Sequence, residues 1–203
     1  MSPRKYSMDK RKAAAEETRR RIVEATLALH AEKGAFGTSW QDIAHRADVS
    51  VGTVYKHFPS LNELVPACGE LVFAISRPPS LEDAPEIFAG ANSLRERLGR
   101  LVSEFFAFYE RGEPYLEIDF QERQLPSVQE WEAHMRATRE GFTREALRPL
   151  DLEPDEETVR ALSALLDFPL FKSFRRHDVS KAEAQEIMNS MLLCWIDERR
   201  GDR

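Results

Sequence analysis

The chain has 203 residues, of which 42% are hydrophobic, and a formal net charge of -6. This indicates a globular protein with one large domain, or a small domain followed by a larger one. The two cysteines give no disulfide framework or metal-binding spacing, the first thirty residues lack the apolar stretch of a signal peptide, and no later run reaches the ~20 apolar residues of a membrane span. We therefore expect a cytoplasmic protein that does not enter a membrane.

The charge is distributed unevenly along the chain. Residues 1–60 contain eleven lysines and arginines against seven acidic residues, a balance of +4, whereas the remainder carries -10. A basic head on an acidic body is typical of nucleic-acid-binding proteins, so the acidic total does not argue against DNA binding. Residues 1–12 are polar and basic, and we expect a flexible arm there. It is either a solubilising tail or a segment that adds phosphate or minor-groove contacts.

A long helix is predicted from about Ala13 to Lys33, with its apolar residues on one stripe and Gly34 as its stop. Two short helical patterns follow it, separated by a tight turn, which is the spacing of a helix-turn-helix. The first of them runs over residues 39–46. We expect Thr38 as its N-cap and Gln41 as the partner in a capping box.

The turn falls at Asp48, a residue type that tolerates the left-handed backbone conformation better than most. Ser50 is a good N-cap for the second helix, whose Val54 and Phe58 point inward at i and i+4. The remaining faces of this helix and the start of the first helix supply the candidate DNA-binding residues: Thr38, Ser39, Ser50, Val51, Gly52, Thr53, Tyr55, Lys56 and His57.

The outer face of the second helix has side chains that suit a DNA groove. Tyr55, Lys56 and Thr53 can hydrogen-bond phosphates or base edges. Gly52 lets the backbone approach closely, Val51 can meet a thymine methyl group, and the helix N-terminus attracts phosphate. Periodicity alone fits an ordinary surface helix beside a core helix equally well, so the residue identities must decide.

The run TSWQDIAHRADVSVGTVYKHFPSLNEL, residues 38–64, resembles the DNA-binding domain of TetR-family transcriptional regulators, in which an I-A, a V-S, a G-T-[VL]-Y and an H-F fall at these mutual distances. Asp48 stands where the family commonly has glycine. Leu61 stands where a lysine often contacts phosphate, so that backbone contact is not expected here. The resemblance covers about residues 18–64, roughly a quarter of the 203 residues.

This resemblance implies an N-terminal three-helix helix-turn-helix domain over residues 13–60 and a helical effector-binding and dimerisation domain over residues 61–203. The remainder of the sequence agrees, because it contains no convincing alternating strand, and the predicted fold is all-α. A capping box opens a helix at Ser60, with Pro66 inside it, and a proline-rich loop follows over residues 77–85. Further helices are predicted over residues 93–111, 115–123, 126–147, 155–177 and 180–200.

Aromatic residues gather on helices that in the family usually surround an effector pocket. The candidate ligand-binding residues, for an unknown small-molecule effector, are Phe105, Phe106, Tyr109, Phe120 and Trp131. Aromatic side chains at helical spacing more often form a packed core than a ligand cavity, and that alternative stays open.

The last helices carry apolar stripes that look too wide for one small domain to cover. Pairing with the same helices of a second subunit would bury these stripes in a four-helix interface, and the resemblance also implies a homodimer. The candidate interface residues are Leu162, Leu166, Phe174, Met188, Met191 and Trp195.

The sequence has no enzyme signature. Its five histidines are scattered without metal-ligand spacing, and it contains neither a P-loop nor G-x-S-x-G. We therefore expect no catalytic residues, no metal and no cofactor. The favoured function is a ligand-responsive transcriptional repressor that binds a pseudo-palindromic DNA operator as a homodimer. The alternatives are a ligand-independent architectural DNA-binding protein and, more remotely, a small-molecule enzyme on a helical scaffold.

Overall fold

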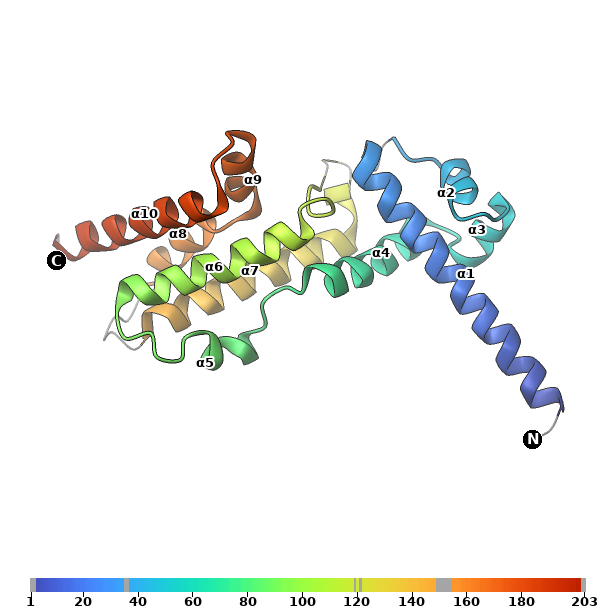
Figure 1. The fold of residues 1–203 in the computed structure, drawn as a ribbon, viewed down its shortest axis with the longest axis horizontal. Coiled ribbons are helices and arrows are strands. Elements are labelled where there is room, and N and C mark those ends of the chain that lie inside the picture. The colour runs from blue at the N-terminus through green and yellow to red at the C-terminus, as the bar shows by residue number, and fades with distance from the viewer. Residues whose placement is uncertain (1–2, 35–36, 119, 121, 149–154, 202–203) are drawn as a thin grey trace. The chain divides into compact units, whose positions relative to one another are not determined.

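The computed structural model describes residues 3–34, 37–118, 120, 122–148 and 155–201 (Figure 1). Across these ranges the regular elements are all helical and no strand occurs, which confirms the predicted all-α fold. None of the helices within them combines the length and the apolar content needed to cross a membrane.

The chain divides into two compact units. Unit 1 comprises Met1–Ile75 and Glu117–Val128, and unit 2 comprises Ser76–Leu116 and Gln129–Arg203. Unit 1 therefore extends beyond residue 60, where the sequence placed a domain boundary. The physical reason is burial, because the helix after residue 60 buries Cys68 in unit 1. This burial, together with the negative charge of Glu122, raises the pKa of the Cys68 thiol to about 12.

Four α-helices lie wholly or mainly in unit 1: α1 (Pro3–Lys33), α2 (Trp40–Arg46), α3 (Val51–His57) and α4 (Leu61–Ser76), together with the short 3-10 helix η2 (Glu122–Gln124). Helix α1 begins at Pro3 and not near Ala13, so the residues from Pro3 to Lys12 are helical where a flexible arm was predicted. Proline is well tolerated in the first turn of a helix, and the lysines, arginines and alanines that follow are strong helix formers.

Helices α1, α2 and α3 pack together around one small core. Its fully or almost fully buried members are Ile22, Thr26 and Leu29 from α1, Ile43 and Ala44 from α2, Val54 from α3, and the flanking Ala47 and Phe58. The one buried hydroxyl among them, that of Thr26, donates to the Ile22 carbonyl at 2.8 Å. Burying each large apolar side chain contributes about 1.5–3 kcal/mol, so this core is what holds α3 in place.

The N-cap predicted for α2 at Thr38 is wrong. Ser39 caps the helix: its Oγ accepts from the Asp42 N–H at 3.1 Å, and the Asp42 carboxylate accepts from the Ser39 N–H at 2.9 Å. The Thr38 hydroxyl instead donates to the Gly34 carbonyl at 2.9 Å. An ionised carboxylate at the third helical position accepts these bonds better than the neutral Gln41 would, and Lys33 lies 2.8 Å from it.

These contacts predict an acid-sensitive start of α2. The hydrogen bond from Lys33, and then those from Ser39, hold the pKa of Asp42 well below its usual value. The unfolded carboxyl titrates near about 4, so the stabilisation by ionised Asp42 is complete above that pH and is lost as the pH falls below it. Trp40 is the first residue of α2. In a variant with the other two tryptophans replaced by phenylalanine, we expect its fluorescence to change below about pH 4.

The matched variant Asp42→Asn should lose this transition, because the amide does not titrate. Identical fluorescence curves for the two proteins between neutral pH and about pH 2 would assign the transition to other carboxyl groups.

Unit 2 contains the remaining helices: η1 (Leu81–Asp83), α5 (Ala84–Ile87), α6 (Leu94–Gly112), α7 (Pro126–Leu147, which begins in unit 1), α8 (Glu156–Leu165), α9 (Phe168–Arg176) and α10 (Lys181–Gly201). Capping boxes at Ser93 and Ser180 open α6 and α10, and α7 has its predicted bounds. Helix α10 packs along α6, and α9 also packs against α6. The segment predicted as a loop over residues 77–85 contains η1 and the start of α5.

The single helix predicted over residues 155–177 is wrong, because the chain breaks between α8 and α9. Pro169 has no N–H to donate, and its ring clashes with the carbonyl four residues earlier, that of Leu165. Leu165 is the last residue of α8. Asp167 then caps α9 by accepting from the Phe168 N–H at 2.9 Å, and it lies 3.1 Å from the Arg139 guanidinium of α7.

Candidate nucleic-acid interface

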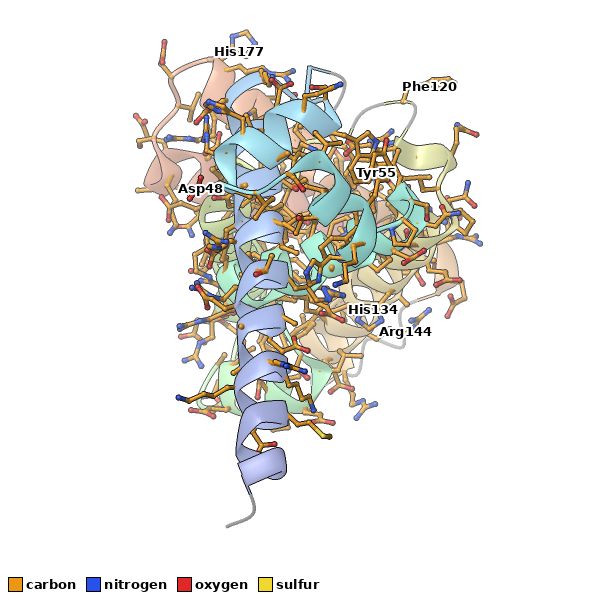
Figure 2. The ribbon with its side chains drawn as sticks, turned by 90° about the vertical axis from the view of Figure 1, so that its right-hand side faces the viewer. Asp48, Tyr55, Phe120, His134, Arg144 and His177 are labelled. Carbon is orange, nitrogen blue, oxygen red and sulfur yellow. The ribbon has the colours of Figure 1, made fainter. Side chains whose placement is uncertain are left out.

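Helices α2 and α3 meet at a tight turn. Asp48 has a φ of 53°, which confirms the left-handed turn predicted at this residue, and Figure 2 shows it between the two helices. The turn is closed by hydrogen bonds from the Asp48 N–H to the His45 carbonyl at 3.2 Å and from the Val49 N–H to the Ala44 carbonyl at 3.0 Å. The backbone itself therefore fixes the angle at which α3 leaves α2.

Ser50 caps α3 as predicted. Its Oγ accepts from the Thr53 N–H at 3.1 Å, and the two hydroxyl oxygens lie 2.8 Å apart. The Thr53 hydroxyl, predicted to meet phosphates or bases, already shares a hydrogen bond within the helix. Val54 and Phe58 are 0% exposed, so α3 presents its opposite face outward.

The candidate DNA-binding residues all keep some exposure. Ser39, Ser50, Gly52, Tyr55 and Lys56 are exposed, and Thr38, Val51, Thr53 and His57 are partly buried. A Cβ added at Gly52 would meet only the Ser50 Oγ, at 3.8 Å. The fold does not require glycine at this position. The absence of a side chain therefore leaves room for a partner molecule that approaches α3 from outside.

Trp40 has a role that its position in the sequence does not predict. The Trp40 ring is half-buried and stacks on Tyr55, with ring centroids 4.9 Å apart and an interplanar angle of 29°. Tyr55 is 45% exposed, and Figure 2 shows it on α3. Trp40 therefore restricts the orientation of Tyr55 while leaving it accessible. No periodicity signal identifies such a contact, because it joins two different helices.

Cations near this surface fall into two groups. The Arg46 guanidinium forms a two-point contact with Glu32 of α1, at 2.7 and 2.9 Å, and Lys33 pairs with Asp42. These two pairs tie α2 to α1. Within the described part of the chain Lys56 has no ion-pair partner, which leaves its ammonium group available to an external anion.

The predicted ligand-binding residues differ in their burial. Phe105, Phe106 and Tyr109 are fully buried in unit 2, where their rings contact Phe142 and Phe171 at centroid distances from 5.2 to 5.7 Å. The Tyr109 hydroxyl donates to the Leu166 carbonyl at 2.7 Å, and burial raises its pKa. These rings form a packed core, the alternative that the sequence left open.

The two remaining candidates differ from this group. Trp131 is half-buried on α7. Phe120 belongs to unit 1 and is 80% exposed, and Figure 2 shows its side chain pointing away from the ribbon. Among the described residues of the segment predicted as a helix over residues 115–123, helical structure begins at Glu122, the first residue of η2.

The predicted dimer-interface residues also divide into two groups. Leu162, Leu166 and Met188 are 0% exposed within the single chain. They belong to the core of unit 2, Leu162 on α8, Leu166 directly after α8 and Met188 on α10. Phe174 and Trp195 are partly buried, and Met191 is 46% exposed.

An open groove with a volume of about 590 Å³ lies along the first half of α10. Its apolar lining includes Ile187 and Met191, both more than 40% exposed. Its polar lining includes the acidic residues Asp178, Glu183 and Glu186. In the described ranges no group of three or more His, Cys, Asp or Glu residues is arranged to hold a metal ion.

Comparison with known proteins gives results of two kinds. A profile of the family described as "Bacterial regulatory proteins, tetR family" matches residues 22–68. The HTH-type transcriptional repressor KstR of Rhodococcus jostii (strain RHA1) is 49% identical over 47 residues, which are 23% of this chain and 22% of that repressor. This match thus spans less than a quarter of the relative's length. The family match covers α2 and α3, the end of α1 and the first half of α4.

Similarity over most of the chain is structural. The crystal structure of NalD, the secondary repressor of the MexAB-OprM multidrug efflux pump in Pseudomonas aeruginosa, has a TM-score of 0.64 at 22% identity and covers 89% of this chain and 96% of that one. The multidrug binding protein EbrR, complexed with imidazole, has a TM-score of 0.59 at 20% identity, covering 85% and 88%. At these identities the similarity establishes the fold alone. The segment that carries helices α2 and α3 is thus similar to the tetR family of bacterial regulatory proteins.

Proposed function

We propose that this protein is a transcriptional repressor that binds an inverted-repeat DNA operator as a homodimer and releases it when a small molecule binds unit 2. The observation that carries the proposal is the outward face of α3, where Tyr55 and Lys56 are exposed beside a glycine that the fold does not require. The repressor KstR, similar over 47 residues, and NalD, similar in fold, are both named as repressors. The protein is accordingly a DNA-binding regulator and not an enzyme.

Each α3 enters one major groove in this proposal. The groove is about 12 Å wide and admits one helix, and the exposed N-terminal turn of α3 presents Val51 and Gly52 to base edges. Tyr55, held by Trp40, and Lys56 contact phosphates at the groove edge. In this proposal Val51 and Gly52 read bases, whereas Tyr55 and Lys56 position the helix.

Replacing Lys56 with alanine tests the positioning role. We expect weaker binding to every DNA sequence and a slope of log K against log salt that is about 0.9 smaller for each phosphate that is no longer neutralised. The matched variant Val51→Ala should change the preference among sites and leave the slope unaltered. Fluorescence anisotropy with two duplexes at several salt concentrations measures both quantities. A slope that Lys56→Ala leaves unchanged would remove this lysine from the phosphate contacts.

The second copy of the chain is proposed to bind at the groove along α10. Its exposed Ile187 and Met191 supply apolar area for this contact. A two-fold axis brings the same groove of each subunit together, so one surface serves both partners. Two copies of α3 then face two half-sites of one operator.

Ligand response is proposed to act through α4, the helix that begins in unit 1 and ends at Ser76 in unit 2. Its end is fixed inside unit 2: Arg111 of α6 donates from Nε to the Ser76 carbonyl at 2.8 Å and from Nη2 to the Arg77 carbonyl at 2.9 Å. A ligand that shifts α6 therefore moves the end of α4. The structural similarity to EbrR, a multidrug binding protein, supports a small-molecule site in unit 2.

The competing function is a ligand-independent architectural DNA-binding protein. Wide compound screening by thermal shift, followed by DNA binding with each stabilising compound, separates the two. A compound that binds unit 2 and weakens DNA binding supports the repressor, because a ligand changes DNA affinity only if it distinguishes the two states. Compounds that bind without changing DNA affinity favour the architectural alternative.

A further inference from the structure

Helix α1 continues far beyond the core of unit 1 (Figure 1). Its buried side chains begin at Ile22, whereas every side chain from Met8 to Glu17 is exposed. An isolated helical segment of this length is only marginally stable in water, so packing within unit 1 does not account for it. The extension is a candidate contact surface.

One face of α1 changes from apolar to basic along its length. Ile22 and Thr26 lie on its buried face. Arg11 precedes Ile22 by about three helical turns, and Lys12 precedes Thr26 by about four, so both continue that face beyond the core. Arg19 marks the transition: its guanidinium carbon lies 4.5 Å from the centre of the Phe58 ring, at the end of α3. The basic stripe, Arg11 and Lys12, therefore follows on from the face that contacts α3.

The two cations of the basic stripe are not neutralised by neighbouring side chains. In the ranges that the structure describes, neither Arg11 nor Lys12 has an ion-pair partner. By contrast, Arg20 on another face of the same helix pairs with Glu17 at 2.7 Å and with Glu24. Two acidic residues of α1, Glu17 and Glu24, thus pair with Arg20 and not with the basic stripe.

We propose that the basic stripe binds the phosphate backbone of DNA that flanks the segment contacted by α3. The proposal rests on the DNA-binding function argued above. A helix with its side chains is about 10–12 Å across and does not enter a minor groove about 6 Å wide, as an extended arm would. The contacts are therefore to phosphates, and they add affinity without adding a preference for particular base pairs.

The double variant Arg11→Gln/Lys12→Gln tests the proposal in the full chain, since glutamine retains helix propensity. Binding is measured on a duplex taken from random-pool selection and on an unrelated duplex, each at several salt concentrations. We expect binding to both duplexes to weaken by the same factor. The slope of log K against log salt should fall by about 0.9 for each phosphate that the variant no longer neutralises, with the preference between duplexes unchanged.

The matched control, Lys10→Gln/Arg21→Gln, removes the same charge from another face of α1 and should change the slope less. Equal slopes for the wild type and Arg11→Gln/Lys12→Gln would overturn the proposal, as would equal losses of affinity in the two double variants. In either case specific binding by the wild type would leave the proposed function standing. A basic helix can also bind an anionic membrane, which sedimentation with anionic phospholipid vesicles tests. The proposal would be overturned if Arg11→Gln/Lys12→Gln lost vesicle binding while its slope of log K against log salt for DNA stayed equal to that of the wild type.

Discussion

The substitution Leu162→Asp should unfold unit 2, whereas Met191→Asp should leave each protomer folded and abolish dimerisation. Leu162 is 0% exposed, so the substitution removes a core side chain, at a cost of about 2–5 kcal/mol, and buries a charge without a partner. That loss is comparable to the whole stability of a typical domain, about 5–15 kcal/mol. Met191 is 46% exposed in the groove along α10, so its replacement costs the single chain little.

Far-UV circular dichroism and sedimentation velocity distinguish these outcomes. The Leu162→Asp protein should lose its cooperative thermal transition, and the Met191→Asp protein should keep that transition and sediment as a monomer. Ile187→Asp, on the same groove, should behave as Met191→Asp does. A Met191→Asp protein that remains dimeric would show that the two copies meet through another surface.

The substitution Arg97→Met should lower the free energy of unfolding of unit 2 by about 3 kcal/mol or more. The buried Arg97 guanidinium of α6 donates from Nε to the Ala146 carbonyl at 2.8 Å and from Nη2 to the Glu145 carbonyl at 2.7 Å, in the last turn of α7. It also stacks over the Phe88 ring at 4.5 Å. Burial lowers the pKa of Arg97, yet a guanidinium remains protonated at neutral pH. Methionine fills similar space but supplies no donors, so the carbonyls are left unsatisfied at about 1–3 kcal/mol each.

The neighbouring Arg100→Met variant is the control. Arg100 donates to the carbonyls of Ile87 and Ala89 at 2.8 and 2.6 Å, but it is exposed, so water replaces it when it is removed. Its loss should cost less than about 1 kcal/mol. Urea denaturation followed by circular dichroism gives both values. Equal destabilisation by the two substitutions would show that burial does not set the contribution of Arg97.

The parts of the fold that could be predicted from the sequence are those fixed by neighbouring residues. The left-handed turn at Asp48, the cap at Ser50 and the capping boxes at Ser93 and Ser180 each depend on a few adjacent side chains. The helix break before Pro169 had a local signal as well, although a single helix was predicted there. The cap at Ser39 was missed because two adjacent residues, Thr38 and Ser39, both have N-cap side chains and the position of Asp42 decides between them.

The candidate sites were harder to predict because they depend on which elements meet. Leu162 and Met191 are both apolar residues at helical spacing, and only the packing of α8 and α10 makes one core and the other surface. Phe105 and Phe120 likewise differ in their surroundings and not in their residue type. The Trp40–Tyr55 stack joins two helices, so no pattern within either one indicates it.

Selection of bound DNA from a random pool tests the central claim, that two copies of α3 read one two-fold operator, most directly. We expect enrichment of an inverted repeat. The centres of its two half-sites should be separated by one helical turn of DNA, ~10 base pairs, or by a multiple of that distance. Selection with the Val51→Ala protein should change the half-site and keep its inverted symmetry. Enrichment of no sequence, or of a site without inverted symmetry, would contradict the account.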